Sequence, residues 1–172
     1  MAPYTHVSEL RVRWPECDPA GIVYFANYLM YFELGTMEYL RARGASWGAL
    51  RHRYGFVGAP RVEALARYRA SARYDDLLAV HAQVSDVTRK IVTFGAQVFR
   101  QADDQLLAEG HIKIALTDAD GRAGVLPPTL VAWLQSDEPF GDQDTSSAVP
   151  VDWPRGASGA AGAPAQPPPD PR

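Results

Sequence analysis

Cysteine is nearly absent from this sequence: Cys17 is the only one among 172 residues. A single cysteine cannot form a disulfide within the chain, so we expect a protein of a reducing compartment, the cytoplasm. Long apolar runs are also missing, and no stretch approaches the roughly 18 residues that a membrane-spanning helix needs. The first residues carry charge and contain no apolar core segment, so we expect no secretion signal.

Positive charge is not in excess. Lys and Arg number 17 against 20 Asp and Glu, which gives a formal net charge of −3. General binding to nucleic acid needs a basic face, so this class of protein is disfavoured. A hydrophobic fraction of 47% with a mean hydropathy of −0.22 is typical of a soluble globular chain.

Proline is unevenly distributed, and this marks a domain boundary. The segment from Asp137 onward holds eight of the 14 prolines and no periodic apolar run. Such a segment buries too little apolar surface to offset its ordering entropy. We therefore expect a folded domain over residues 4–135 and a disordered Pro/Gly/Ala-rich tail over residues 136–172.

Within the domain, the apolar pattern changes from helical to strand-like. Leu10, Val12 and Trp14 alternate with charged residues, which predicts a first strand. A helix is predicted over residues 25–43 with Gly44 ending it, and a shorter one over 46–54. The strands predicted after these cover residues 61–70, 77–86, 91–100 and 106–117, and a last short helix covers 127–134.

The predicted order favours an α+β fold. The strands are joined by loops too short for parallel crossovers, so we expect an antiparallel sheet of about five strands. The simplest arrangement curls this sheet around the single long helix. One such protomer leaves sheet edges unpaired, and we therefore expect at least a homodimer.

The segment CDPAGIVYFANY, which begins at Cys17, is the richest in chemistry. It lies where a loop leads into the long helix, and free N–H groups at a helix start favour anions and developing oxyanions. Asp18 in that loop could act on a carbonyl held by these N–H groups. Asp-Pro is also common in turns, so Asp18 as an ordinary turn residue or helix cap is the competing interpretation.

Other chemistries have less support. No histidine lies near Cys17 to activate its thiol, and the histidines are scattered singly without metal-ligand spacing. Neither G-x-G-x-x-G nor G-x-S-x-G occurs, which excludes the dinucleotide-binding fold and the usual serine hydrolases. We expect no metal and no cofactor.

The run DPAGIVYFANY, followed by Tyr31, Phe32 and Glu33, resembles the active-site segment of the 4-hydroxybenzoyl-CoA thioesterase family. The resemblance continues through YGFVGAPRVEALARYRASARYDDLLAV, VTRKIVTF and LLAEGHIKIALTDADGRAGVLP, and covers about residues 7–134. The family has the hotdog fold and includes acyl-CoA thioesterases associated with the Tol-Pal system.

The resemblance implies roles for three positions. Asp18 matches the catalytic aspartate, which attacks the thioester carbonyl or activates a water for that attack. The backbone N–H of Phe25 matches the helix-start oxyanion donor. Glu33, two turns into the helix and roughly 12 Å along it, matches a position that faces the acyl pocket of the neighbouring subunit. The family has an aspartate there for 4-hydroxybenzoyl substrates, so Glu33 disfavours that acyl group.

The resemblance also implies a substrate-binding set. It comprises Gly21, Val23, Tyr24 and Tyr28 beside the catalytic loop, and Arg89 and Lys90 in a turn that contacts the nucleotide. The aromatic residues could equally be packing residues of the core or an interface, and Arg89 and Lys90 could be solvated charges of a hairpin.

The predicted activity is hydrolysis of a small or aromatic acyl-CoA to the free acid and CoA, by a homodimer or a tetramer built from two dimers. Coenzyme A is then part of the substrate. Two alternatives stay open, a thioesterase acting on an acyl-carrier protein and a non-catalytic acyl-CoA-binding protein. A hotdog dehydratase is disfavoured, because it needs a His near the helix start and none lies between His6 and His52.

Overall fold

The computed structural model describes residues 4–141. Within this range, nine elements follow one another: β1 (Thr5–Arg11), η1 (Trp14–Glu16), α1 (Asn27–Ala42), α2 (Trp47–Tyr54), β2 (Arg61–Tyr68), β3 (Leu77–Val87), β4 (Ile91–Arg100), β5 (Gln105–Ala115) and α3 (Pro128–Leu134). The elements predicted from apolar periodicity are thus present, with shifts of a few residues at their ends. None of the helices in this range is long and apolar enough to cross a membrane.

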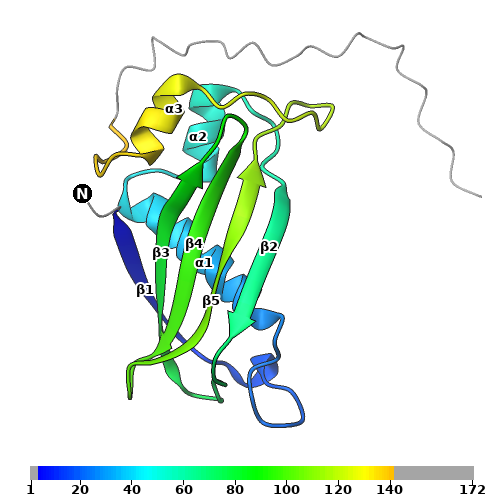
Figure 1. Ribbon diagram of the computed structural model, residues 1–172, viewed down its shortest axis with the longest axis vertical. Coiled ribbons are helices and arrows are strands. Elements are labelled where there is room, and N and C mark those ends of the chain that lie inside the picture. The colour runs from blue at the N-terminus through cyan, green and yellow to red at the C-terminus, as the bar shows by residue number, and fades with distance from the viewer. Residues whose placement is uncertain (1–3, 142–172) are drawn as a thin grey trace, which may run out of the picture.

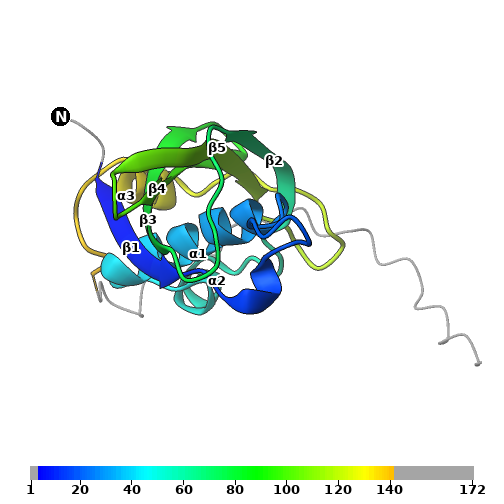
Figure 2. The same ribbon diagram turned by 90° about the horizontal axis from the view of Figure 1, so that it is seen from below.

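The five strands form one antiparallel sheet in the order β1-β3-β4-β5-β2. The sheet curves around α1, which crosses its concave face (Figures 1 and 2). Tight turns join β3 to β4 and β4 to β5, because antiparallel neighbours need only a short connection. This confirms the predicted α+β architecture. It leaves β1 and β2 as the two edge strands.

Helix α1 lies close to the sheet because two glycines remove side chains from the contact. A Cβ on Gly35 of α1 would lie 2.7 Å from a methyl carbon of Val80 on β3. On the sheet side, a Cβ on Gly110 of β5 would lie 2.9 Å from the Phe32 ring and would overlap the carbonyl oxygen of Leu65 on β2. Phe32 is fully buried at this contact.

The ends of the two N-terminal helices follow the local sequence. Gly44, at φ +75°, provides the left-handed conformation just after α1, as predicted. The Ser46 hydroxyl caps α2 by accepting the Ala49 N–H at 3.1 Å, and Gly55 ends α2 at φ +69°.

The packed structure continues past the predicted boundary at residue 135. Arg43, 2% exposed, donates to the main-chain oxygens of Trp133, Ser136 and Glu138 at 2.7–2.9 Å. The Phe140 N–H in turn donates to the Arg43 carbonyl at 2.6 Å. These bonds hold residues 136–141 against the end of α1. The rest of the predicted tail, residues 142–172, lies outside the described residues.

The prediction for the first strand is wrong at its end. β1 begins at Thr5 and stops at Arg11, and Trp14 starts the 3-10 turn η1 with its side chain 74% exposed. Pro15 explains the early end, since proline has no N–H to donate to a ladder and suits a first helical turn.

Replacing Gly110 by Ala should lower the free energy of unfolding by about 3 kcal/mol, since the new methyl group would press on both the β2 backbone and the Phe32 ring. Urea unfolding followed by circular dichroism measures this. Gly48→Ala in α2 is the matched control: its Cβ has only the Ser46 hydroxyl nearby, at 3.6 Å, and alanine favours helix. A Gly110→Ala variant as stable as Gly48→Ala would contradict the packing described here.

Candidate active site

Asp18 begins the turn of a small hairpin that precedes α1. Its N–H donates to the Ile22 carbonyl, and the Gly21 N–H donates to the Asp18 carbonyl, both at 2.9 Å. Cys17 and Val23 form the bridge at the base of the hairpin. Gly21 adopts φ +75°, which glycine allows without strain.

The Asp18 side chain takes part in its own turn. One carboxylate oxygen, Oδ1, accepts the Ala20 N–H at 2.9 Å, which is Asx-turn geometry. The turn interpretation of Asp18 is therefore correct, and it does not compete with a chemical role. The second oxygen, Oδ2, accepts no hydrogen bond from the residues in the described range and is free to act on another molecule.

The start of α1 leaves N–H groups without acceptors. The Asn27 and Tyr28 N–H groups donate to the carbonyls of Tyr24 and Phe25, whereas the N–H groups of Phe25 and Ala26 have no acceptor within residues 4–141. No side chain caps the helix at Ala26. Unpaired N–H groups at a helix start are an anion-binding arrangement. Phe25 thus has the backbone geometry expected of an oxyanion donor.

Glu16, which no sequence pattern singled out, holds this loop on both sides. Its carbonyl accepts the Tyr24 N–H at 2.9 Å and the Asn27 side-chain amide at 2.8 Å. Its buried carboxylate accepts the Arg13 N–H at 2.8 Å, two guanidinium bonds from Arg13, and the Tyr31 hydroxyl at 3.0 Å. Tyr31 lies 15 residues away in sequence, which is why the partnership is invisible before folding.

These contacts change the acidity of both partners. Burial acts to raise the pKa of the Glu16 carboxyl, but the hydrogen bonds from Arg13 and Tyr31 outweigh it and hold that pKa below its ordinary value. Burial raises the pKa of the Tyr31 hydroxyl, and the neighbouring Glu16 charge raises it further. The pair is therefore a carboxylate that accepts from a neutral phenol.

The predicted substrate-binding residues near the loop divide into buried and exposed ones. Val23 and Tyr28 are 3% exposed: the Val23 N–H donates to the Ala72 carbonyl at 2.9 Å, and the Tyr28 hydroxyl accepts the Ala72 N–H at 3.0 Å. Both tie the loop to the connection between β2 and β3. Tyr24 and Phe25 are 47% and 57% exposed, with ring centroids 4.6 Å apart, and present an aromatic surface.

Phe25 also contacts an edge strand of the sheet. The Tyr68 hydroxyl at the end of β2 donates to the Phe25 carbonyl at 3.1 Å, and the two rings meet edge to face. The helix start therefore borders the unpaired edge of β2.

Glu33 has a partner in its own protomer. Its carboxylate forms two hydrogen bonds with the Arg61 guanidinium, one of them from Nε at 3.0 Å. Arg61 also donates to the Ala59 carbonyl and lies over the Trp47 ring, 5.7 Å from its centroid. Arg61 could not be identified as this partner from the sequence, because it follows Glu33 by 28 residues and comes from another element.

Arg89 and Lys90 lie far from Asp18 within one protomer. They occupy the turn between β3 and β4, whereas the blue loop that carries Asp18 lies at the opposite end of the sheet (Figure 1). Lys90 donates to the Ala123 carbonyl at 3.0 Å, and the Arg89 side chain is exposed. Within one chain, the structure does not bring these cations to the loop that carries Asp18.

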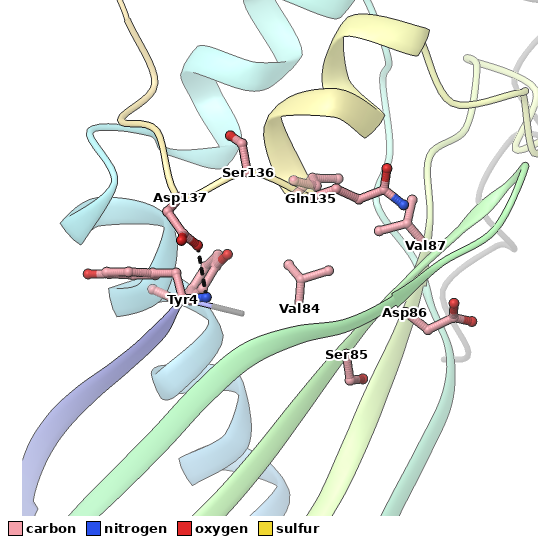
Figure 3. Close-up of a pocket in the computed structure, with 10 residues that line it drawn as sticks. Tyr4, Val84, Ser85, Asp86, Val87, Gln135, Ser136 and Asp137 are labelled. Carbon is pink, nitrogen blue, oxygen red and sulfur yellow. Dashed lines mark hydrogen bonds between the residues drawn. The ribbon is translucent and has the colours of Figure 1, made fainter. Parts of the chain in front are cut away.

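A cavity of about 260 Å³ lies between β1, the end of β3 and the segment after α3. Figure 3 shows the Asp137 carboxylate on one side of it, where it accepts the Tyr4 N–H at 3.1 Å. None of the predicted site residues lines this cavity.

The potential metal-ligating side chains of the described range do not cluster. No group of three or more His, Cys, Asp or Glu side chains there could hold a metal ion. His111 bonds to Glu63 at 2.7 Å, and His81 packs against the Phe99 ring. Neither histidine contacts Cys17, which is half-buried.

The chain resembles known proteins in family, sequence and structure. The model of the thioesterase-like superfamily matches residues 12–135. The acyl-CoA thioesterase YbgC of Haemophilus influenzae is 33% identical over 112 residues, which cover 63% of this chain and 78% of that protein. The 4-hydroxybenzoyl-CoA thioesterase of Pseudomonas sp. is 33% identical over 81 residues, 46% of this chain and 57% of that enzyme.

The solved structure of the Pseudomonas enzyme superposes with a TM-score of 0.67 at 27% identity, covering 74% of this chain and 97% of that one. A 4-hydroxybenzoyl-CoA thioesterase carrying an aspartate-to-asparagine substitution, in complex with 4-hydroxybenzoyl-CoA, gives 0.68 at 26% identity over 77% of this chain and 99% of that one. These similarities confirm the expected hotdog fold.

The lowered pKa of Glu16 predicts a pH-dependent contribution to stability. The folded protein keeps this carboxyl ionised to a lower pH than the unfolded chain does, so its contribution is present above pH 4.5 and is lost as the pH falls through the lowered value. Glu16→Gln should cost about 1–3 kcal/mol at pH 7, as expected for hydrogen bonds to a charged group. Urea unfolding of both proteins between pH 7 and pH 3 should show this difference shrinking with acidification. A difference that stays constant across the range would contradict the assignment.

Proposed function

This chain belongs to the thioesterase-like superfamily, and we propose that it hydrolyses an acyl-CoA thioester to the free carboxylic acid and coenzyme A. The observation that carries the proposal is that the loop before α1 holds both Asp18 Oδ2, which accepts no hydrogen bond from the described residues, and the Phe25 N–H, which has no acceptor among them. A carboxylate and a helix-start donor on one short loop are what thioester hydrolysis requires.

The proposed chemistry uses groups of the chain alone. The Phe25 N–H donates a hydrogen bond to the carbonyl oxygen as negative charge develops on it, a contribution of about 2.7–4 kcal/mol for one such donor. Asp18 Oδ2 either attacks the carbonyl carbon, expelling the CoA thiolate and forming an anhydride that water cleaves, or takes a proton from the attacking water. In both routes the carbon–sulfur bond breaks and one water is consumed. A proton released from that water passes to the CoA thiolate, and Asp18 ends as the free carboxylate. Neither route needs a cofactor.

A small or aromatic acyl group suits the surface beside the helix start. Tyr24, Phe25 and Tyr68 place exposed rings there. Aromatic rings pack favourably edge to face with an aromatic acyl group. The Glu33 carboxylate is ion-paired with Arg61, so it is not free to accept a hydrogen bond from the hydroxyl group of a 4-hydroxybenzoyl substrate. This supports acyl groups other than 4-hydroxybenzoyl.

The site is completed, in this proposal, by a second copy of the chain. All eight residues of edge strand β2 are at least partly exposed, and the outer face of α1 presents Met30, 65% exposed, and Leu34, 37% exposed. A long open edge beside an apolar helix face is an arrangement that proteins cover. Antiparallel pairing of two β2 strands covers both.

The same pairing explains where the predicted cations act. A twofold axis beside β2 makes the two sheets run in opposite directions. The β3–β4 turn of the partner, with the partner's Arg89 and the partner's Lys90, then lies at the end of the sheet where the first copy carries Asp18. Cationic side chains there would face the phosphates of CoA. Assembly of two dimers into a tetramer and a place of action in the cytoplasm complete the proposal.

Asp18→Asn should reduce turnover by at least about 100-fold, since the amide neither attacks nor takes a proton effectively. The measurement is thiol release from acetyl-, butyryl-, lauroyl-, benzoyl-, 4-hydroxybenzoyl- and phenylacetyl-CoA. Cys17→Ala is the control for the neighbouring nucleophile and should remain active.

Three results would contradict the proposed substrate, activity or mechanism. Activity only on acyl-carrier-protein thioesters would identify the alternative carrier, and acyl-CoA binding without turnover would identify a binding protein. Full activity of Asp18→Asn would refute the proposed mechanism.

Met30→Glu should weaken the dimer, because a charge on the outer face of α1 would be buried on pairing. Sedimentation velocity over a range of protein concentrations should show wild type as a dimer or tetramer and the variant shifted toward monomer, with reduced turnover. Met30→Leu keeps the face apolar and should assemble normally. A monomeric wild type with full activity would contradict the composite site.

A further inference from the structure

We propose that Glu16, held by Tyr31, is a positioning residue that fixes the loop carrying Asp18 relative to the helix start. The catalytic part of this inference rests on the function proposed above. The structural part, that Glu16 sets the geometry of residues 17–24, stands on the contacts alone.

Glu16 connects the three segments that meet at the site. Its carboxylate bonds to Arg13 before the loop and to Tyr31 within α1, and its carbonyl accepts the N–H of Tyr24 after the loop. Asp18 follows Glu16 by two residues, and Phe25 follows Tyr24 directly. The nucleophile or base and the oxyanion donor are therefore each attached to a residue in this hydrogen-bonded junction.

The junction is rigid because it is buried and anchored in the long helix. Glu16 is 9% exposed and Tyr31 4% exposed, and the Tyr31 ring packs edge to face with Tyr28. Tyr31 is one turn into α1, so its hydroxyl moves with the helix body. The hydrogen bond from Tyr31 to Glu16 thus fixes the loop relative to α1.

Arg13 has a different part in the same junction. Its side chain is 76% exposed and closes the outer side of the Glu16 carboxylate. An exposed ion pair of this kind contributes little on its own. The buried bond to Tyr31 is therefore the one expected to control loop position.

The first test is steady-state kinetics of Glu16→Gln, Tyr31→Phe and their double variant on the best substrate of wild type. A loop misplaced by a fraction of an ångström to 1 Å should lower kcat by about 10- to 100-fold. KM should change little, because the CoA contacts are elsewhere. Glu16→Gln removes the charge of the acceptor and Tyr31→Phe removes the donor of the same hydrogen bond, so the effects of the two changes on kcat should not add in the double variant.

The matched control is Glu109→Gln. Glu109 is also an ion-paired carboxylate, bonded to Arg69 at 2.5 Å, but it lies on β5 outside the junction. Its kcat should match wild type. Near wild-type kcat in a folded Glu16→Gln protein would overturn the catalytic part. So would a loss of activity that tracks only the fraction of protein unfolded.

The second test needs no activity. Amide hydrogen exchange should become faster at Asp18 and Tyr24 in Glu16→Gln and Tyr31→Phe, with the β3 and β4 amides unchanged. Unchanged exchange at the loop would overturn the structural part. A wild type that cleaves no thioester would instead refute the proposed function, and the exchange result would still decide whether Glu16 fixes the loop.

Discussion

The close approach of α1 to the sheet is the constraint on which the other features depend. It depends on Gly35 and Gly110, where a Cβ would press on Val80 of β3 and on the Phe32 ring of α1, respectively. With α1 at this depth, its first turn meets the end of β2, and the Tyr68 hydroxyl reaches the Phe25 carbonyl. A helix displaced outward by one methyl group would carry the helix start away from β2 and from the hairpin.

The loop before α1 derives its shape from polar contacts rather than from apolar packing. Its turn is closed by main-chain bonds and by the Asp18 carboxylate, and its base is held by Glu16. Within residues 4–141, one carboxylate oxygen of Asp18 and the N–H groups of Phe25 and Ala26 have no hydrogen-bond partner. An acceptor and helix-start donors left unpaired on one ordered loop are suited to bind a ligand.

The fold was largely predictable from sequence, and the site only in part. The apolar face of α1 and the regular spacing of short turns predict one helix against an antiparallel sheet, which is local information. The prediction that Trp14 belongs to the first strand was wrong. The alternation of apolar and charged residues continues to Trp14, but the strand ends at Arg11, before Pro15. Two side-chain pairs could not be predicted from the sequence, namely Glu33 with Arg61 and Glu16 with Tyr31. Each pair joins two elements that come into contact only in the folded structure. The resemblance located Asp18 and Phe25, whereas the contacts that hold their loop had to come from the structure.

Three open features of the protomer have a common solution. Edge strand β2 has unpaired backbone groups, the outer face of α1 exposes Met30 and Leu34, and the helix start lies at the border of both. An exposed site of this kind excludes no water, and charge stabilisation by a single N–H is far weaker in water than in a dry pocket. A second copy paired along β2 would satisfy the edge, cover the apolar face and enclose the helix start at once. The same contact would then stabilise the dimer and exclude water from the site, so that dimer formation and activity would depend on each other.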